Sequence, residues 1–168
     1  MLFKVREKLF SLRNEFVITD GQDNPMFKVI GKFFSWTNKM SFQNLEGEEL
    51  ALLQKVPFTF FATRYQILTK GTLYAEIQKH FTILKSRFTI TEGDRSTLTL
   101  KGSLFSHEFQ FFREGKPIAS ISKKRFSWRD SYGVDIPDGE DVLLILCSCI
   151  VIDQILHKNH SHGASHGR

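Results

Sequence analysis

The feature that most constrains this chain is an apolar run over residues 142–152, Val-Leu-Leu-Ile-Leu-Cys-Ser-Cys-Ile-Val-Ile. A surface helix carries polar side chains every three or four residues, but only Ser148 interrupts this run, so a helix here must be surrounded on all sides. Its helical length of about 16 Å is roughly half of what a bilayer core requires, and Asp153 and Gln154 follow directly. The sequence therefore predicts a helix wrapped by protein, with no transmembrane segment.

The start of this helix is marked by the acidic residues Asp138, Glu140 and Asp141, which offer a cap and favourable negative charge at its N-terminus. We expect the central helix to span residues 140–157, with a flexible His-rich tail over residues 158–168. We expect the domain itself to span residues 1–157, because 168 residues suit one domain with a sizeable core.

The two cysteines of the chain, Cys147 and Cys149, lie two residues apart in the apolar run. On a helix this spacing points their side chains about 200° away from each other, so they are not expected to pair. They are interpreted as buried, reduced thiols, which is typical of a reducing compartment. The N-terminus alternates apolar and charged residues and lacks the apolar core of a secretory signal, so we expect a cytoplasmic protein.

The rest of the chain contains an internal repeat with six copies. In each copy an apolar residue is followed four positions later by a large apolar residue, two positions later by another, and then by a glycine. The copies are Leu12/Phe16/Ile18/Gly21, Trp36/Met40/Phe42/Gly47, Phe61/Tyr65/Ile67/Gly71, Leu84/Phe88/Ile90/Gly93, Phe105/Phe109/Phe111/Gly115 and Trp128/Tyr132/Val134/Gly139. The two-residue step places two apolar side chains on one sheet face, and the glycine suits a tight turn. The repeated aromatic positions, including Trp36, Trp128, Phe16 and Phe88, are therefore expected in the core.

Each copy predicts a β-hairpin, and the last runs directly into the apolar helix. Five hairpins, a single strand from the sixth copy and an N-terminal strand near residues 3–6 together give about 12 strands. A barrel of about eight strands is filled by its own side chains, whereas a wider one has room for a helix about 10 Å across. The expected fold is thus mainly β: a closed antiparallel barrel of about 12 strands, built from repeated hairpins and enclosing one buried C-terminal helix.

Three segments carry a resemblance to a known family: residues 8–13, residues 124–135 and the helix over residues 141–157. Together they resemble the LURP-one-related family, including its bacterial YxjI-type members, over nearly the whole chain. That family resembles the tubby C-terminal domain and the phospholipid scramblases. The resemblance implies a twelve-stranded barrel around a C-terminal helix, and tubby-like relatives imply an adaptor that binds phosphoinositides. The segment 132–137, Tyr-Gly-Val-Asp-Ile-Pro, and the Cys-containing helix after it are similar to scramblases in particular.

Candidate ligand-binding residues are basic. The net charge of +5 permits anionic partners, although ordinary solubilising charge accounts for it equally well. Basic side chains recur where the repeats enter their hairpins, and clusters of 4–8 Lys/Arg recognise acidic lipids. The expected anion-binding residues are Lys79, Lys85, Arg87, Lys123, Lys124, Arg125 and Arg129. Nucleic acid is not expected, because no recognised motif is present and most aromatic residues belong to the repeat.

Other candidate chemistry is sparse. The tail residues His160, His162 and His166 are weak candidates for a transition metal, because the tail lacks cysteine or carboxylate ligands. Asp135 and its acidic neighbours before the helix are better explained by helix capping than by calcium. No catalytic constellation is visible, so neither catalytic residues nor a cofactor are expected. We expect a non-enzymatic binding or scaffold module, cytoplasmic or peripheral at a membrane, that binds anionic phospholipid headgroups. A protein-interaction adaptor is the alternative, and a scramblase-like or enzymatic activity is the third.

Overall fold

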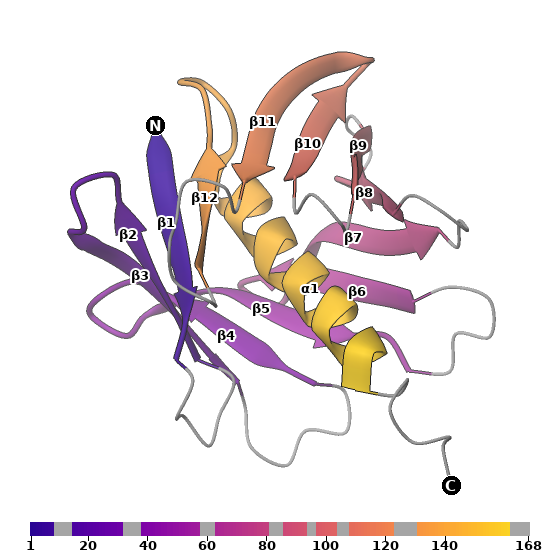
Figure 1. Cartoon of the computed structure of the whole chain (residues 1–168). Coiled ribbons are helices and arrows are strands. Elements are labelled where there is room, and N and C mark those ends of the chain that lie inside the picture. Colours follow the sequence, from indigo (N-terminus) through magenta and orange to yellow (C-terminus); the bar gives the residue numbers. More distant parts are fainter. Residues whose placement is uncertain are drawn as a thin grey trace, which may run out of the picture.

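A computed structural model of the 168-residue chain describes residues 1–8, 15–31, 38–57, 63–80, 86–93, 97–103, 108–122 and 131–161, with the backbone alone at residues 86, 103 and 157–161. The described residues form twelve strands and one helix (Figure 1). The elements are β1 (Leu2–Glu7), β2 (Glu15–Asp20), β3 (Pro25–Gly31), β4 (Met40–Gln43), β5 (Glu49–Lys55), β6 (Thr63–Thr69), β7 (Thr72–His80), β8 (Ser86–Thr91), β9 (Thr97–Ser103), β10 (Glu108–Arg113), β11 (Lys116–Ser122), β12 (Ser131–Asp135) and α1 (Val142–Ser161).

The strands pair antiparallel in sequence order, and β1 also pairs with β12, which closes the barrel. The predicted fold class is therefore confirmed. Because consecutive strands run in opposite directions, the connections between them lie alternately at the two ends of the barrel. The turn end holds the turns after β2, β4, β6, β8 and β10 and the connection from β12 to α1. At the mouth end β1, β3, β5, β7, β9 and β11 finish, and α1 runs from the turn end toward it (Figure 1).

The internal repeat lines the inside of the barrel. Its second and third positions are buried in every copy: Phe16, Ile18, Met40, Phe42, Tyr65, Ile67, Phe88, Ile90, Phe109, Phe111, Tyr132 and Val134. The two-residue period of a strand accounts for this, because alternate side chains point to the same face. The first position of each copy, which includes Trp36 and Trp128, lies outside the described residues. The expected core role therefore holds for Phe16 and Phe88 and remains a prediction for the two tryptophans.

The turns of the hairpins mostly use the repeat glycines, and the strand registers contain bulges. Positive φ angles occur at five of the repeat glycines, such as Gly71 (79°) and Gly115 (80°), as the turn chemistry predicts. Gly21 is the exception, because Asp23 adopts the left-handed conformation there with φ of 68°. In four hairpins the register shifts just after the third repeat position, for example between Ile67 and Leu68. Such bulges increase strand twist and help the sheet to curve.

The helix α1 fills the barrel. Residues 144–152 of α1 are at most 3% exposed, and the hydroxyl of Ser148 donates a hydrogen bond to the Leu144 carbonyl at 2.7 Å. The backbone of α1 approaches β5, β6 and β7 most closely (Figure 1). Ala51 and Ala75 lie in this wall, opposite Phe42 and Ile67, and their small side chains allow the close approach. The helix ends at Ser161, beyond the expected His157, since no glycine or proline intervenes before Gly163.

The connection between β12 and α1 is tied to several parts of the wall. The backbone N–H of Ile136 donates to the carbonyl of Met1 at 2.9 Å, and the Arg113 guanidinium binds the Glu140 carboxylate at 2.7 Å. Asp141 caps the helix by accepting the N–H of Leu144 at 2.9 Å. The Tyr74 hydroxyl donates to the other oxygen of the same carboxylate. These contacts fix where α1 enters the barrel.

The double role of Asp141 gives a stability prediction. Replacing Asp141 with Ala removes the helix cap and the acceptor for Tyr74, and we expect a loss of about 2–3 kcal/mol in the free energy of unfolding. For a chain of this size the thermal midpoint should fall by roughly 5–10 °C, measured by circular dichroism. Asp138→Ala, at an exposed position on the same connection, should change it by less than about 2 °C. Equal midpoints for the two variants would contradict the proposed anchoring role of Asp141.

Candidate anion-binding site

Of the seven basic residues predicted to bind anions, the structure describes Lys79 and Arg87. Lys85, Lys123, Lys124, Arg125 and Arg129 lie outside the described residues. Lys79 pairs with Phe88 across β7 and β8, whereas Arg87 pairs with His80. Since Phe88 is fully buried, Lys79 shares its inward face and Arg87 points outward. The two residues are therefore close in the sheet but do not contribute to a single surface.

Arg87 belongs instead to a row of basic side chains across three neighbouring strands on the outer face. His80 in β7 lies opposite Arg87 in β8, and Arg87 lies opposite Lys101 in β9. We call His80, Arg87 and Lys101 the basic row. His80 and Lys101 were not among the predicted residues. The two-residue alternation assigns each residue to the inner or outer face, but placing these three residues in one row also requires the registers of β7 with β8 and of β8 with β9.

The basic row brings two like charges together. Arg87 and Lys101 are both exposed, and directly opposed like charges destabilise a sheet. Within the described part of the chain neither forms an ion pair with a carboxylate. The Lys101 ammonium instead lies 5.1 Å from the centre of the Phe112 ring, a cation–π contact. His80 is held by a 2.6 Å hydrogen bond between its Nε2 atom and the Thr89 hydroxyl. An anion bound here would relieve the repulsion between the two cations.

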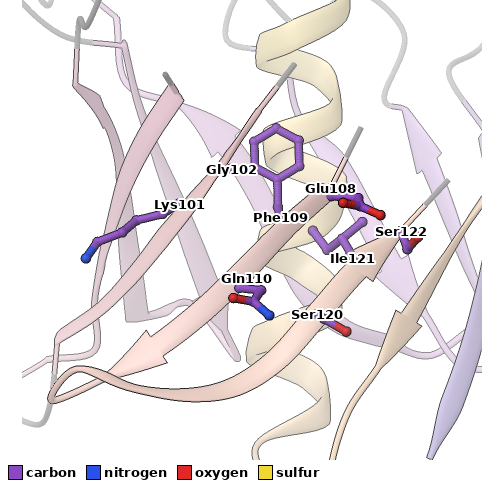
Figure 2. Close-up of a pocket in the computed structure, with 8 residues that line it drawn as sticks. All are labelled: Lys101, Gly102, Glu108, Phe109, Gln110, Ser120, Ile121 and Ser122. Carbon is purple, nitrogen blue, oxygen red and sulfur yellow. The ribbon is translucent and has the colours of Figure 1, made fainter. Parts of the chain in front are cut away.

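A depression of about 470 Å³ adjoins the row where β9 and β11 finish and β10 begins. Residues of both sheet faces line it: Lys101, Gly102, Glu108, Phe109, Gln110, Ser120, Ile121 and Ser122. Figure 2 shows Gln110 and Ser120 close together on neighbouring strands, while Lys101 extends away from them. The depression thus offers hydroxyl and amide groups beside a lysine, together with the Glu108 carboxylate, so its lining is polar and carries both signs of charge.

Gly102 shapes this wall. It lies opposite Phe109, and a Cβ atom at residue 102 would stand 2.3 Å from both the Glu108 carbonyl oxygen and the Phe109 ring. The ring therefore occupies the place where any other residue would carry its side chain. The sequence pattern did not single out Gly102, because it lies outside the turn glycines of the repeat.

The charges of the barrel are separated between its ends. The turn end carries most of the described carboxylates: Asp20, Asp23, Glu46, Glu48, Glu49, Glu92, Glu114, Asp135, Asp138, Glu140 and Asp141. The basic row lies in the mouth half, on the last residue of β7, the start of β8 and the end of β9. Among the described residues, negative charge is therefore concentrated at the turn end, away from the basic row.

The described side chains show no activated nucleophile among the cysteines. Cys147 and Cys149 are fully buried and unpaired with each other, as expected. Burial raises the pKa of both thiols well above the usual value, and reactivity requires the thiolate. His160 lies in the last turn of α1 with its side chain undescribed, and His162 and His166 lie outside the described residues.

Comparison with known proteins agrees with this architecture. A family profile described as LURP-one-related matches residues 1–153. The chain belongs to the LURP-one-related family. One relative of the chain is the uncharacterized protein YxjI of Bacillus subtilis (strain 168). It is 31% identical over 155 residues, covering 92% of this chain and 93% of YxjI.

A solved structure shares the fold. The X-ray structure of an Arabidopsis thaliana protein matches with a TM-score of 0.66 at 17% identity, covering 92% of this chain and 91% of that chain. At this identity the likeness shows the fold alone. Among the described residues of this LURP-one-related protein, no helix is both long and apolar enough to cross a membrane.

Proposed function

We propose that this LURP-one-related protein is a non-enzymatic binding module that docks on anionic phospholipid headgroups through its basic row. The supporting observation is the opposed pair Arg87 and Lys101, which lie beside a polar depression and have no carboxylate partner in the described chain. The acidic turn end would face away from such a surface. The proposed location is the cytoplasm, with peripheral association at the membrane.

Sedimentation with vesicles tests this proposal. We expect the protein to sediment with phosphatidylserine-containing vesicles at low salt, and to be released as salt screens the attraction. Replacing Arg87 and Lys101 together by Gln should remove about 1 kcal/mol of membrane-binding free energy for each residue. The affinity for these vesicles should therefore fall on the order of thirtyfold. Vesicles of phosphatidylcholine alone should bind neither protein.

The matched control is Lys70→Gln combined with Lys116→Gln, which removes the same charge at the turn end. It should bind within about twofold of the unmodified protein. Equal affinity for the Arg87/Lys101 variant and this control would refute a role for the basic row. A third variant carries Ser at the predicted positions Lys123, Lys124, Arg125 and Arg129, and it tests whether those residues add to the same surface.

A protein-interaction role is the second candidate, favoured by apolar side chains at the turn end. Leu45 and Leu73 are 44% and 48% exposed in or beside the turns after β4 and β6, which are neighbouring hairpins. Exposed apolar groups within an acidic surface suit a basic protein partner. Absence of vesicle binding by the unmodified protein, together with a partner lost on Leu45→Ser and Leu73→Ser substitution, would favour this candidate.

A further inference from the structure

The inner face of the barrel carries three polar side chains side by side near the mouth end. Lys55 of β5 pairs with Tyr65, and Lys79 of β7 pairs with Thr63, so the two lysines lie on either side of β6. Neighbouring strands are about 4.8 Å apart and a strand rises about 3.3 Å per residue. Because the lysines pair with β6 residues two positions apart, their backbones are about 12 Å from each other on a diagonal across β6. Their long, flexible stems allow both ammonium groups to approach Thr63.

Side-chain contacts on the outer face establish that these residues point inward. Gln54 donates a hydrogen bond to Gln66 at 3.2 Å, and Arg64 forms an ion pair with Glu76 at 3.8 Å. These residues alternate with Lys55, Thr63 and Lys79, and no register shift intervenes in these parts of the strands. Deeper on the same inner face, Tyr65 is 1% exposed and burial raises its pKa to about 12.

The two lysines lack a nearby acidic partner among the described residues. The described carboxylates on the inner side near the mouth are Glu7 of β1 and Asp153 of α1. Both act on Tyr132 of β12, which the strand order places across the barrel from β6. Burial partly desolvates the Lys79 ammonium and thereby lowers its pKa. No described carboxylate nearby compensates for this loss of hydration. Both lysines are half-buried, so part of each side chain is exposed to solvent.

We propose that Lys55, Lys79 and Thr63 form an anion subsite inside the mouth of the barrel, and that its ligand carries a phosphate monoester group. Two ammonium groups match the charge of about −1.5 to −2 on such a group at pH 7, and the Thr63 hydroxyl supplies a third donor. The subsite is independent of the proposed headgroup binding, because it shares no residue with the basic row and lies on the opposite face of the sheet.

Titration calorimetry with inorganic phosphate and with glycerol 3-phosphate tests the subsite. The unmodified protein should bind both saturably, and Lys55→Gln with Lys79→Gln should weaken binding at least tenfold. The Lys70→Gln/Lys116→Gln and Arg87→Gln/Lys101→Gln variants should stay within about twofold. Absence of saturable binding, or equal affinity after the Lys55/Lys79 change, would overturn the proposal whatever the vesicle result.

A second measurement addresses a purely structural role. Cations near the C-terminal end of a helix are stabilising, and α1 ends at the mouth. If the subsite binds phosphate, inorganic phosphate should raise the thermal midpoint of the unmodified protein but leave that of Lys79→Met, which keeps a side chain of similar length, unchanged. If phosphate changes the thermal midpoint of neither protein, and Lys79→Met simply has a lower midpoint than the unmodified protein, the lysines stabilise the helix and the proposal fails.

Phosphatidate vesicles identify the source of the phosphate. Reduced sedimentation of the Lys55/Lys79 variant on phosphatidate, relative to the unmodified protein, would assign the subsite to a lipid headgroup. Unchanged sedimentation together with lost glycerol 3-phosphate binding would assign it to a free phosphate monoester. The Arg87/Lys101 variant, measured in parallel, reports separately on the basic row.

Discussion

A single methyl group added at residue 102 is expected to destabilise the barrel severely. In a Gly102→Ala variant the new Cβ would stand 2.3 Å from the Glu108 carbonyl oxygen and 2.3 Å from the Phe109 ring. The ring can rotate or shift, but the carbonyl belongs to the paired strand, so β9 and β10 must separate. We expect a loss of about 3 kcal/mol or more, which lowers the thermal midpoint by roughly 6–12 °C.

Gly21→Ala is the matched control for this prediction. The nearest atoms to a Cβ at residue 21 are 3.7–3.9 Å away, an ordinary contact distance, and the φ angle there is not positive. Its midpoint should therefore stay within about 2 °C of the unmodified protein, measured by the same thermal scan. Similar thermal midpoints for the two alanine variants would show that β9 and β10 can accommodate a side chain at residue 102, contrary to this prediction. Because Gly102 lines the depression, Gly102→Ala should also be compared in the vesicle assay.

A carboxylate placed in the middle of α1 is expected to have the largest effect on stability. Ile150 is fully buried inside the barrel, and Ile150→Asp would place an uncompensated charge there at a cost of several kcal/mol. Since domains of this kind are stable by about 5–15 kcal/mol, the loss is a large share of the total. We expect the thermal midpoint to fall by at least about 15 °C, or the cooperative transition to disappear.

Ile150→Val isolates the effect of charge from that of shape. It removes one methyl group and should cost about 0.5–1.5 kcal/mol, with a midpoint only a few degrees lower. Denaturant titrations of the two variants provide the free energies. If Ile150→Asp were as stable as Ile150→Val, solvent would have to reach this face of the helix, and α1 could not fill the barrel as described.

The strands and the helix were predictable because burial follows short periods in the sequence. The spacing of Phe16 and Ile18, repeated along the chain, identifies the inner face, and the run before Asp153 identifies the enclosed helix. The bulge between Ile67 and Leu68 was not predictable, because it depends on how a hairpin accommodates the curvature of a closed sheet. The same holds for Ala51 and Ala75, whose small size is explained only by the approach of α1.

The candidate site was less predictable than the fold. The recurrence of basic residues where the repeats enter their hairpins predicts Lys79 and Arg87 on one surface, but β7 directs Lys79 inward, two residues after Ile77. Applying the two-residue alternation to Lys79 would have identified this position. The basic row required more information, since the alignment of Arg87 with Lys101 depends on the register between β8 and β9 and not on either strand alone.

The position of α1 in the chain has a consequence for biosynthesis. Closure joins Met1 to Ile136, and the segment that fills the interior is translated after all twelve strands. Until α1 has been synthesised, the aromatic inner face therefore lacks the helix against which it packs in the complete fold. We expect a polypeptide released before α1 is made to expose the apolar side chains that α1 covers, and to be recognised by chaperones and proteases. The barrel can therefore be filled only after α1 has been translated.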